Sequence, residues 1–152
     1  MTHARNIKPR LSWDEYALEL AKVAAGRSED PFHQVGACAL DATHRVIGVA
    51  YNGLATGKNV DASFWSDRDT RRPFMIHAES NLLSLIKRGE CDVIACTLLP
   101  CTACATSIAA HGVRRVVYAD TYTRDDKALE IFKFYNIECV QLLEHQQILE
   151  SV

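Results

Sequence analysis

Long apolar runs, abundant glycine and proline, and an excess of one charge are all absent from this sequence of 152 residues. No run approaches the roughly 18 apolar residues of a membrane span, so we expect no association with a membrane. Seven glycines and four prolines exclude a collagen-like or low-complexity chain. Seventeen Lys and Arg against nineteen Asp and Glu give a net charge of −2, which disfavours a nucleic-acid partner. The remaining composition, 48% apolar and 24% charged, is typical of a globular protein, and we expect one domain over residues 1–152 with its core at about 12–142.

A secretory signal is missing as well, because residues 1–10 are polar and basic without an apolar centre. We therefore expect a cytoplasmic location, in which the six cysteines remain reduced thiols. Such thiols either pack as small apolar groups or bind a metal as thiolates. Only Cys101 and Cys104 have the spacing of metal ligands.

The hydrophobic pattern predicts alternating strands and helices. Ser12-Trp13-Asp14-Glu15 has the pattern of a capping box, so a helix should begin there and end at Gly26. Residues 53–72 are polar and aperiodic, which indicates a long functional or mobile loop. Strands are expected at 34–40 and 45–51, joined by a hairpin at 41–44, and at 93–98, 113–118 and 137–142; further helices are expected at 78–88, 102–110 and 126–135, with a short helix or frayed end at 144–152. This alternation favours largely parallel strands with helices on both faces, and hence a three-layer α/β/α domain with a central five-stranded mixed sheet.

Two short motifs carry the strongest chemical signal, His77-Ala78-Glu79 and Pro100-Cys101-Thr102-Ala103-Cys104. Each follows an extended segment and begins a predicted helix. The two cysteines are three residues apart and share a helix face, and the helix N-terminus favours their thiolate forms. One His and two Cys would bind zinc and leave its fourth position open for a water molecule, whose pKa falls from about 15.7 to roughly 7. Glu79 is two residues past the ligand His77, where it could move that proton.

A C-x-x-C pair can instead form a closed structural zinc site, which needs a fourth ligand. Cys96 and His111 are the nearby candidates, but Cys96 lies in an apolar stretch, and a surface role fits His111 at the end of its helix. Glu79 and Pro100 also fit the H-x-E…P-C-x-x-C signature of zinc-dependent nucleobase deaminases, which favours the catalytic interpretation. The remaining histidines are expected to be solvated or locally hydrogen-bonded: His3, His33, His44 and His145.

From about Trp13 to Leu142 the sequence resembles the deoxycytidylate deaminase branch of the cytidine deaminase superfamily. The resemblance implies that His77, Cys101 and Cys104 bind one catalytic zinc ion and that Glu79 carries protons. It also implies a deoxycytidine nucleotide as substrate, with the reaction dCMP + H2O to dUMP + NH3. The segments that carry the likeness are Arg27–Pro31 with Gln34–Ala37, Tyr51–Gly53, His77–Asn81, Pro100–Cys104 and Ala119–Tyr122.

The same resemblance implies further contacts with the nucleotide. The backbone amide of Ala78 would hold the pyrimidine 2-carbonyl, Asn52 would meet the sugar or base, and Tyr122 would line the pocket. The residues themselves leave alternatives: an Asn-Gly pair tolerates positive φ and can point an amide into a cleft, or Asn52 is a plain turn residue and Tyr122 a packing residue. For the phosphate we favour Arg27, because guanidinium groups suit phosphate oxygens. The basic side chains of the long loop are each expected to be solvated: Lys58, Arg68, Arg71 and Arg72.

Family members are commonly hexamers that dCTP activates and dTTP inhibits. The resemblance therefore implies a homo-oligomer, hexamer or dimer, with these effectors and with Mg2+ accompanying a triphosphate effector. The chain departs from many members by carrying Leu54–Gly57 where they place Pro, and Glu29 where they often carry Lys. These departures leave the regulation open, together with the choice among a monophosphate, a triphosphate and a modified cytosine. Residues 53–76 contain neither Cys nor His, so no second zinc is expected.

Two other functions stay open. The first is deamination of another base, such as guanine or a tRNA adenosine, although the net charge disfavours a tRNA substrate. Free-nucleoside cytidine deaminases usually carry Cys at the position of His77, and riboflavin-pathway deaminases often carry a fused reductase, for which this chain has no room. The second is a catalytically silent nucleotide-binding module that zinc stabilises.

Overall fold

The computed structural model describes residues 7–143. The predicted helix or frayed end at 144–152 lies outside the described residues, as do His3 and His145. Among the helices of residues 7–143, none combines the length and the apolar character that crossing a membrane requires.

Five strands form one mixed sheet in the order β2-β1-β3-β4-β5. Strand β1 runs antiparallel to both of its neighbours, β2 and β3, whereas β3 with β4 and β4 with β5 are parallel pairs. The predicted five-stranded mixed sheet is confirmed, but antiparallel pairing extends further than the strand–helix alternation suggested, because β3 pairs with a strand of the hairpin. The strands are β1 Gly36–Leu40, β2 Val46–Tyr51, β3 Val93–Leu98, β4 Arg115–Asp120 and β5 Glu138–Gln141.

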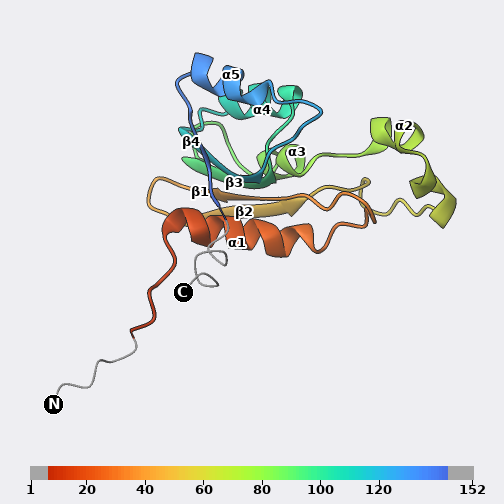
Figure 1. Cartoon of the computed structure of the whole chain (residues 1–152), viewed down its shortest axis with the longest axis horizontal. Helices are drawn as coiled ribbons and strands as arrows, with labels where there is room; N and C mark the ends of the chain where they lie inside the picture. Colours follow the sequence, from red (N-terminus) through yellow and green to blue (C-terminus); the bar gives the residue numbers. More distant parts are fainter. Residues whose placement is uncertain (1–6, 144–152) are drawn as a thin grey trace.

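Helices cover both faces of the sheet and complete the predicted three layers (Figure 1). The helix α1 (Trp13–Ala25) lies on one face, and α3 (Ala78–Leu83), α4 (Thr102–Ala110) and α5 (Ala128–Phe134) lie on the other. Side chains alternate along each strand between the two cores. In β3, Val93 and Ala95 face α1, whereas Ile94 and Cys96 face the three-helix layer.

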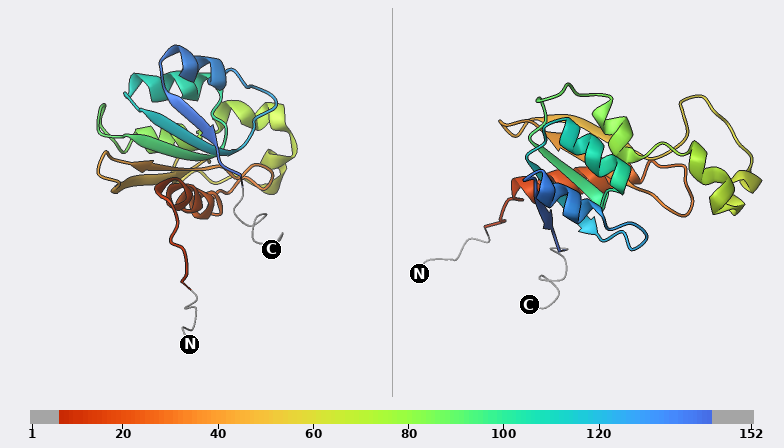
Figure 2. Two further views of the ribbon diagram at one scale, coloured as in Figure 1. Left: turned by 60° about the vertical axis from the view of Figure 1, so that its left-hand side comes forward. Right: turned by 90° about the horizontal axis from the view of Figure 1, so that it is seen from above.

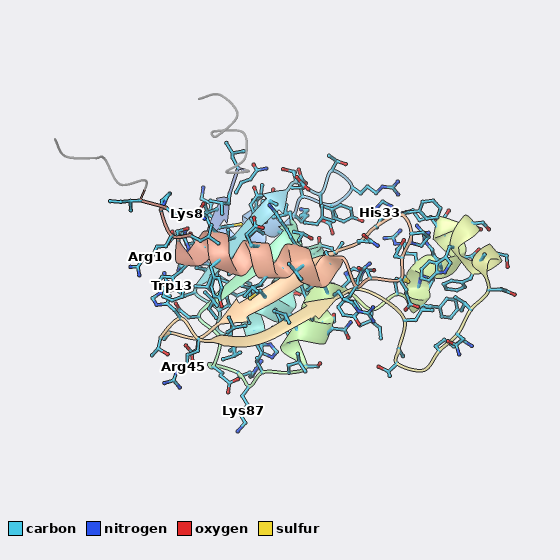
Figure 3. All side chains as sticks on the ribbon, turned by 90° about the horizontal axis from the view of Figure 1, so that it is seen from below. Lys8, Arg10, Trp13, His33, Arg45 and Lys87 are labelled. Atoms are coloured by element: carbon cyan, nitrogen blue, oxygen red, sulfur yellow. The ribbon has the colours of Figure 1, made fainter. Side chains whose placement is uncertain are left out.

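The first helix begins and ends where its sequence predicted, at the Ser12 capping box and at Gly26. Ser12 Oγ accepts a hydrogen bond from the Glu15 amide at 3.1 Å, and Glu15 Oε1 accepts one from the Ser12 amide at 2.9 Å, so the capping box is complete. At the other end α1 lies directly on the sheet at Gly36, where a Cβ would come within 1.9 Å of the Ala21 carbonyl oxygen. Figure 3 shows Trp13 at the first turn of α1, where its ring stacks on His44 of the hairpin with centroids 4.6 Å apart.

The largest difference from the predicted boundaries is at α3, which was expected to reach residue 88 and ends at Leu83. Beyond Leu83 the chain tightens into turns, in which the Leu85 amide donates to the Leu82 carbonyl and the Ile86 amide to the Leu83 carbonyl. These turns still bury Ile86 in the core. The apolar pattern therefore predicted correctly that Ile86 is buried, but wrongly that the backbone there is helical.

Between β2 and α3, residues 54–75 leave the three layers and return; we call this segment the excursion. The base of this excursion is closed by paired backbone hydrogen bonds between Gly53 and Ile76, at 3.0 and 2.8 Å. The predicted plain loop instead contains three short helical segments, η1 (Ala62–Ser66), α2 (Arg68–Arg71) and η2 (Arg72–Phe74). Figures 1 and 2 show this part projecting from one end of the molecule.

Candidate functional site

One edge of the sheet collects the ends of several strands. Strands β2, β3 and β4 end at this edge, and β1 begins there, as the pairing of Gly36 with Tyr51 and of Leu98 with Asp120 shows. The connections that leave this edge lead to His77 at the start of α3, to Cys101 at the start of α4, and to the segment that contains Tyr122. Segments distant in sequence therefore meet here, which is the common location of sites in α/β folds.

His77, Cys101 and Cys104 form one cluster, with their ligand atoms all within 4.8 Å of one another. The Nδ1 atom of His77 lies 3.3 Å from Cys104 Sγ and 3.4 Å from Cys101 Sγ. His77 and Cys101 both occupy N-cap positions, and neither side chain makes a capping hydrogen bond, so both are free to take part in the cluster. The predicted ligand set is therefore brought together by the first turns of two helices.

The donor set and its spacing fit zinc. In a tetrahedral site with Zn–S distances of about 2.3 Å and Zn–N distances of about 2.0–2.1 Å, nitrogen and sulfur ligands lie about 3.5 Å apart. The observed separations of 3.3 and 3.4 Å are close to that value. Among residues 7–143 no fourth His, Cys, Asp or Glu joins this cluster. Cys96 lies buried in the core, and His111 Nδ1 lies 3.2 Å from the Ser107 carbonyl at the end of α4, so neither completes a closed structural site.

The two thiols divide their protons unequally. The hydrogen bond from Cys104, with a further one from His77, lowers the pKa of Cys101 to about 4. The same sulfur–sulfur contact and burial raise the pKa of Cys104 far above its usual value. A divalent cation would replace the shared proton and hold both sulfurs as thiolates.

Glu79 is buried beside this cluster, with only 4% of its surface exposed. Burial raises the pKa of its carboxyl group. A carboxyl group whose pKa is raised holds a proton more readily than a solvated one, which suits it to accept and return a proton during a reaction. Its position two residues after His77, on the first turn of α3, places it next to the metal-ligand atoms as the sequence predicted.

A pocket of about 160 Å³ opens over the cluster. Its lining includes Glu79 and two of the three predicted ligands, His77 and Cys101. Other lining residues come from the segment before β1, the excursion, and the segment after β4. Three of the four predicted substrate contacts lie on its wall, namely Asn52, Ala78 and Tyr122. The fourth, Arg27, is exposed and is not part of the wall.

Asn52 lies on the wall but does not have the predicted conformation. Neither Asn52 nor Gly53 has positive φ. The Asn52 amide donates to the Val35 carbonyl at 3.1 Å, and Gly53 pairs with Ile76. The Asn52 side chain accepts a hydrogen bond from the Val35 amide at 2.9 Å and donates one to the His33 carbonyl at 2.8 Å. Asn52 therefore braces the segment before β1 against the end of β2.

Arg71 contradicts the expectation that the basic side chains of the long loop are solvated, because only 4% of its surface is exposed. Its guanidinium donates to the Trp65 carbonyl at 2.8 Å and lies 3.9 Å from the buried carboxylate of Asp30. The ring of Phe32 packs against it at 5.0 Å. This contact joins the excursion to the segment before β1, so both become walls of one pocket.

Further basic side chains line the pocket near Arg71. Arg68 and Arg72 come from the excursion, and Arg124 follows β4. Within the described part of the chain, no carboxylate oxygen lies within 4.0 Å of the guanidinium of Arg72 or Arg124. Sequence reasoning assigned no role to Arg124 or His33, which also lines the pocket, because neither belongs to a recognisable motif. Figure 3 shows His33 at the opposite end of α1 from Trp13, towards the excursion.

Comparisons with known proteins agree with this geometry. The family model for the cytidine and deoxycytidylate deaminase zinc-binding region matches residues 11–120. A deoxycytidylate deaminase of Homo sapiens is 33% identical over 137 residues, covering 84% of this chain and 76% of the relative. One of Mycobacterium phage D29 is 37% identical over 126 residues, covering 72% and 95%. In fold, the chain is similar to a dCMP deaminase of cyanophage S-TIM5 in complex with dCMP and dUMP, with a TM-score of 0.71, 23% identity and coverage of 84% and 95%.

Proposed function

The chain belongs to the cytidine and deoxycytidylate deaminase family, and we propose that it catalyses the zinc-dependent hydrolytic deamination of dCMP to dUMP and ammonia. The observation that carries the proposal is the open ligand set of His77, Cys101 and Cys104 beside the buried carboxyl group of Glu79, at the base of a pocket. The relatives named deoxycytidylate deaminase support the choice of substrate.

The chemistry follows from where each group lies. Zinc bound by His77, Cys101 and Cys104 would supply Lewis acidity that makes water a nucleophile at neutral pH. Glu79 takes one proton from the water as its oxygen bonds to C4 of cytosine and delivers it to N3. It then takes the second proton from the new C4 hydroxyl and gives it to the amine, so that the 4-carbonyl forms as the C4–N bond breaks and ammonia leaves. Ala78 and Tyr122 both line the pocket. We propose that the Ala78 amide, at the start of α3, donates to the 2-carbonyl and that Tyr122 packs beside the nucleotide. In this proposal Glu79 carries both protons, and both come from the water molecule.

A panel of nucleosides and nucleotides tests this proposal. We expect ammonia release from dCMP to exceed that from deoxycytidine, dCTP, guanine nucleotides and tRNA adenosine. Turnover of a different base in preference to dCMP, with dCTP and Mg2+ present as effectors, would overturn the substrate assignment. Tight nucleotide binding without any ammonia release would establish the silent module instead.

The arginines of the pocket support a phosphate on the substrate. Arg68, Arg71, Arg72 and Arg124 line the same pocket as Asp30 and Glu79, so its lining has more basic than acidic side chains. Charge-assisted hydrogen bonds from guanidinium groups are well suited to phosphate oxygens. We therefore place the 5′-phosphate against Arg72 and Arg124. The sequence-based choice, Arg27, stays a prediction for the same role.

Arg124→Gln should raise KM for dCMP by about 10- to 100-fold, because a hydrogen bond to a charged group is worth about 1.5–3 kcal/mol. Its kcat/KM for deoxycytidine, which lacks the phosphate, should change little. Steady-state kinetics on both substrates measure the difference. Lys58→Gln removes an exposed charge outside the pocket and is the matched control, and Arg27→Gln tests the alternative. An equal loss on both substrates would contradict the phosphate contact.

Several properties expected from the composition or implied by the resemblance stay predictions. These are the single domain, the cytoplasmic location, the absence of nucleic-acid and membrane partners, the hexamer or dimer, and regulation by dCTP and dTTP with Mg2+. Measurement of the solution mass with and without dCTP or dTTP would test the last two.

A further inference from the structure

The carboxylate of Asp125 makes a contact that the proposed reaction does not use. Its Oδ2 accepts a hydrogen bond from the Thr102 backbone amide at 2.7 Å, and its Oδ1 accepts one from the Thr102 hydroxyl at 2.8 Å. Thr102 is the first residue of α4, between the two cysteines of the ligand set. A carboxylate on the chain after β4 therefore holds the start of the helix that carries Cys104.

A residue outside α4 caps this helix, because the side chain of its N-cap residue makes no capping hydrogen bond. The N-cap position belongs to Cys101, whose side chain makes no capping hydrogen bond and instead joins the metal-ligand cluster. The first amides of a helix lack partners within the helix, and side-chain oxygens commonly satisfy them. Asp125 satisfies the amide of Thr102, and its negative charge lies at the positive end of the helix dipole. The Thr102 amide also lowers the pKa of Asp125, so the carboxylate is ionised at neutral pH.

The same residue holds the wall of the pocket. The Asp125 amide donates to the Tyr122 carbonyl at 3.3 Å, closing a turn that contains Arg124. Tyr122 and Arg124 both line the pocket. A continuous set of hydrogen bonds thus runs from the pocket wall through Asp125 to Thr102 and the start of α4.

We propose that Asp125 is a positioning residue that fixes the Tyr122–Arg124 wall to the metal-ligand helix, so that the nucleotide is held in register with the reacting groups. The inference rests on the proposed function, since it concerns how dCMP is positioned. Losing this link loosens the wall and leaves the ligand atoms of His77, Cys101 and Cys104 in place. Loss of Asp125 should therefore weaken nucleotide binding more than it lowers zinc content or the stability of the fold.

Asp125→Ala should raise KM for dCMP by about tenfold and change kcat and zinc content by less than about threefold. Asp125→Asn, which keeps one oxygen acceptor, should recover part of the KM. Binding of dUMP, measured by calorimetry, should weaken in parallel and provides a readout that needs no turnover. Thr102→Val removes the hydroxyl donor and should raise KM in the wild-type background but not in Asp125→Ala, because both changes remove the same bond.

Ser12→Ala is the matched control, because it removes the capping bond of α1, whose first turn does not line the pocket. It should lower thermal stability and leave KM unchanged. The inference is overturned if Asp125→Ala changes KM no more than Ser12→Ala does. If the alanine variant does not fold, Asp125→Asn and Thr102→Val are compared with Ser12→Ala in the same way. Loss of zinc with a matching fall in kcat would also overturn it. If the wild-type protein does not deaminate dCMP, the proposed function is refuted instead. The role of Asp125 is then still tested by comparing dUMP binding between the wild type and Asp125→Ala.

Discussion

Glu79→Gln should reduce deamination of dCMP by about 10²- to 10⁴-fold, the contribution typical of a positioned acid–base group. The amide has nearly the size and shape of the carboxyl group but cannot accept and return a proton, so every transfer from water to the leaving amine loses its carrier. Glu79 is not one of the three clustered ligands, so zinc content should remain at the wild-type value. Single-turnover kinetics and metal analysis on the same preparation measure both quantities.

The structure offers a control for this substitution. Glu130 lies exposed on α5, where its carboxylate is 3.6 Å from the Lys127 ammonium group, and Glu130→Gln should leave kcat and KM unchanged. Binding of dUMP to Glu79→Gln should persist, which separates a lost proton carrier from a collapsed pocket. Substantial activity in Glu79→Gln would show that another group moves the protons. Equal inactivity of the wild type, with nucleotide binding retained, would show a silent module.

Much of the metal-binding half of the site was predictable because its signal is local. His77 and Glu79 are two residues apart, and Cys101 and Cys104 are three apart, so a helical first turn is enough to orient each pair. The sequence also places both pairs directly after extended segments. Only the meeting of the two pairs depends on the tertiary fold, which brings the starts of α3 and α4 to the same end of the sheet.

The nucleotide-binding half was not predictable in the same way. Arg71 is buried because the excursion folds back onto Asp30 and Phe32, a contact that no spacing in the sequence indicates. Asp125 follows β4 in the chain and caps α4, whereas a helix is ordinarily expected to be capped by its own N-cap residue. Asn52 was expected to sit in a turn, but its amide donates to the Val35 carbonyl and the next residue, Gly53, pairs with Ile76. In each case a contact between distant segments decides the conformation.

Cys104→Ser should abolish activity and remove most of the zinc, because a serine hydroxyl is a poor replacement for a thiolate ligand. It should also remove the stability that bound zinc provides. A ligand present at about 1,000 times its Kd stabilises the folded state by about 4.1 kcal/mol, and 1 kcal/mol corresponds to about 2–4 °C in a chain of this size. A strong chelator should therefore lower the melting temperature of the wild type by about 8–16 °C and leave that of Cys104→Ser unchanged.

Cys38→Ala is the matched control, because Cys38 is also buried but faces α1 on the opposite side of the sheet. This variant should keep its zinc and its response to the chelator. Full zinc content and activity in Cys104→Ser would contradict the three-ligand site.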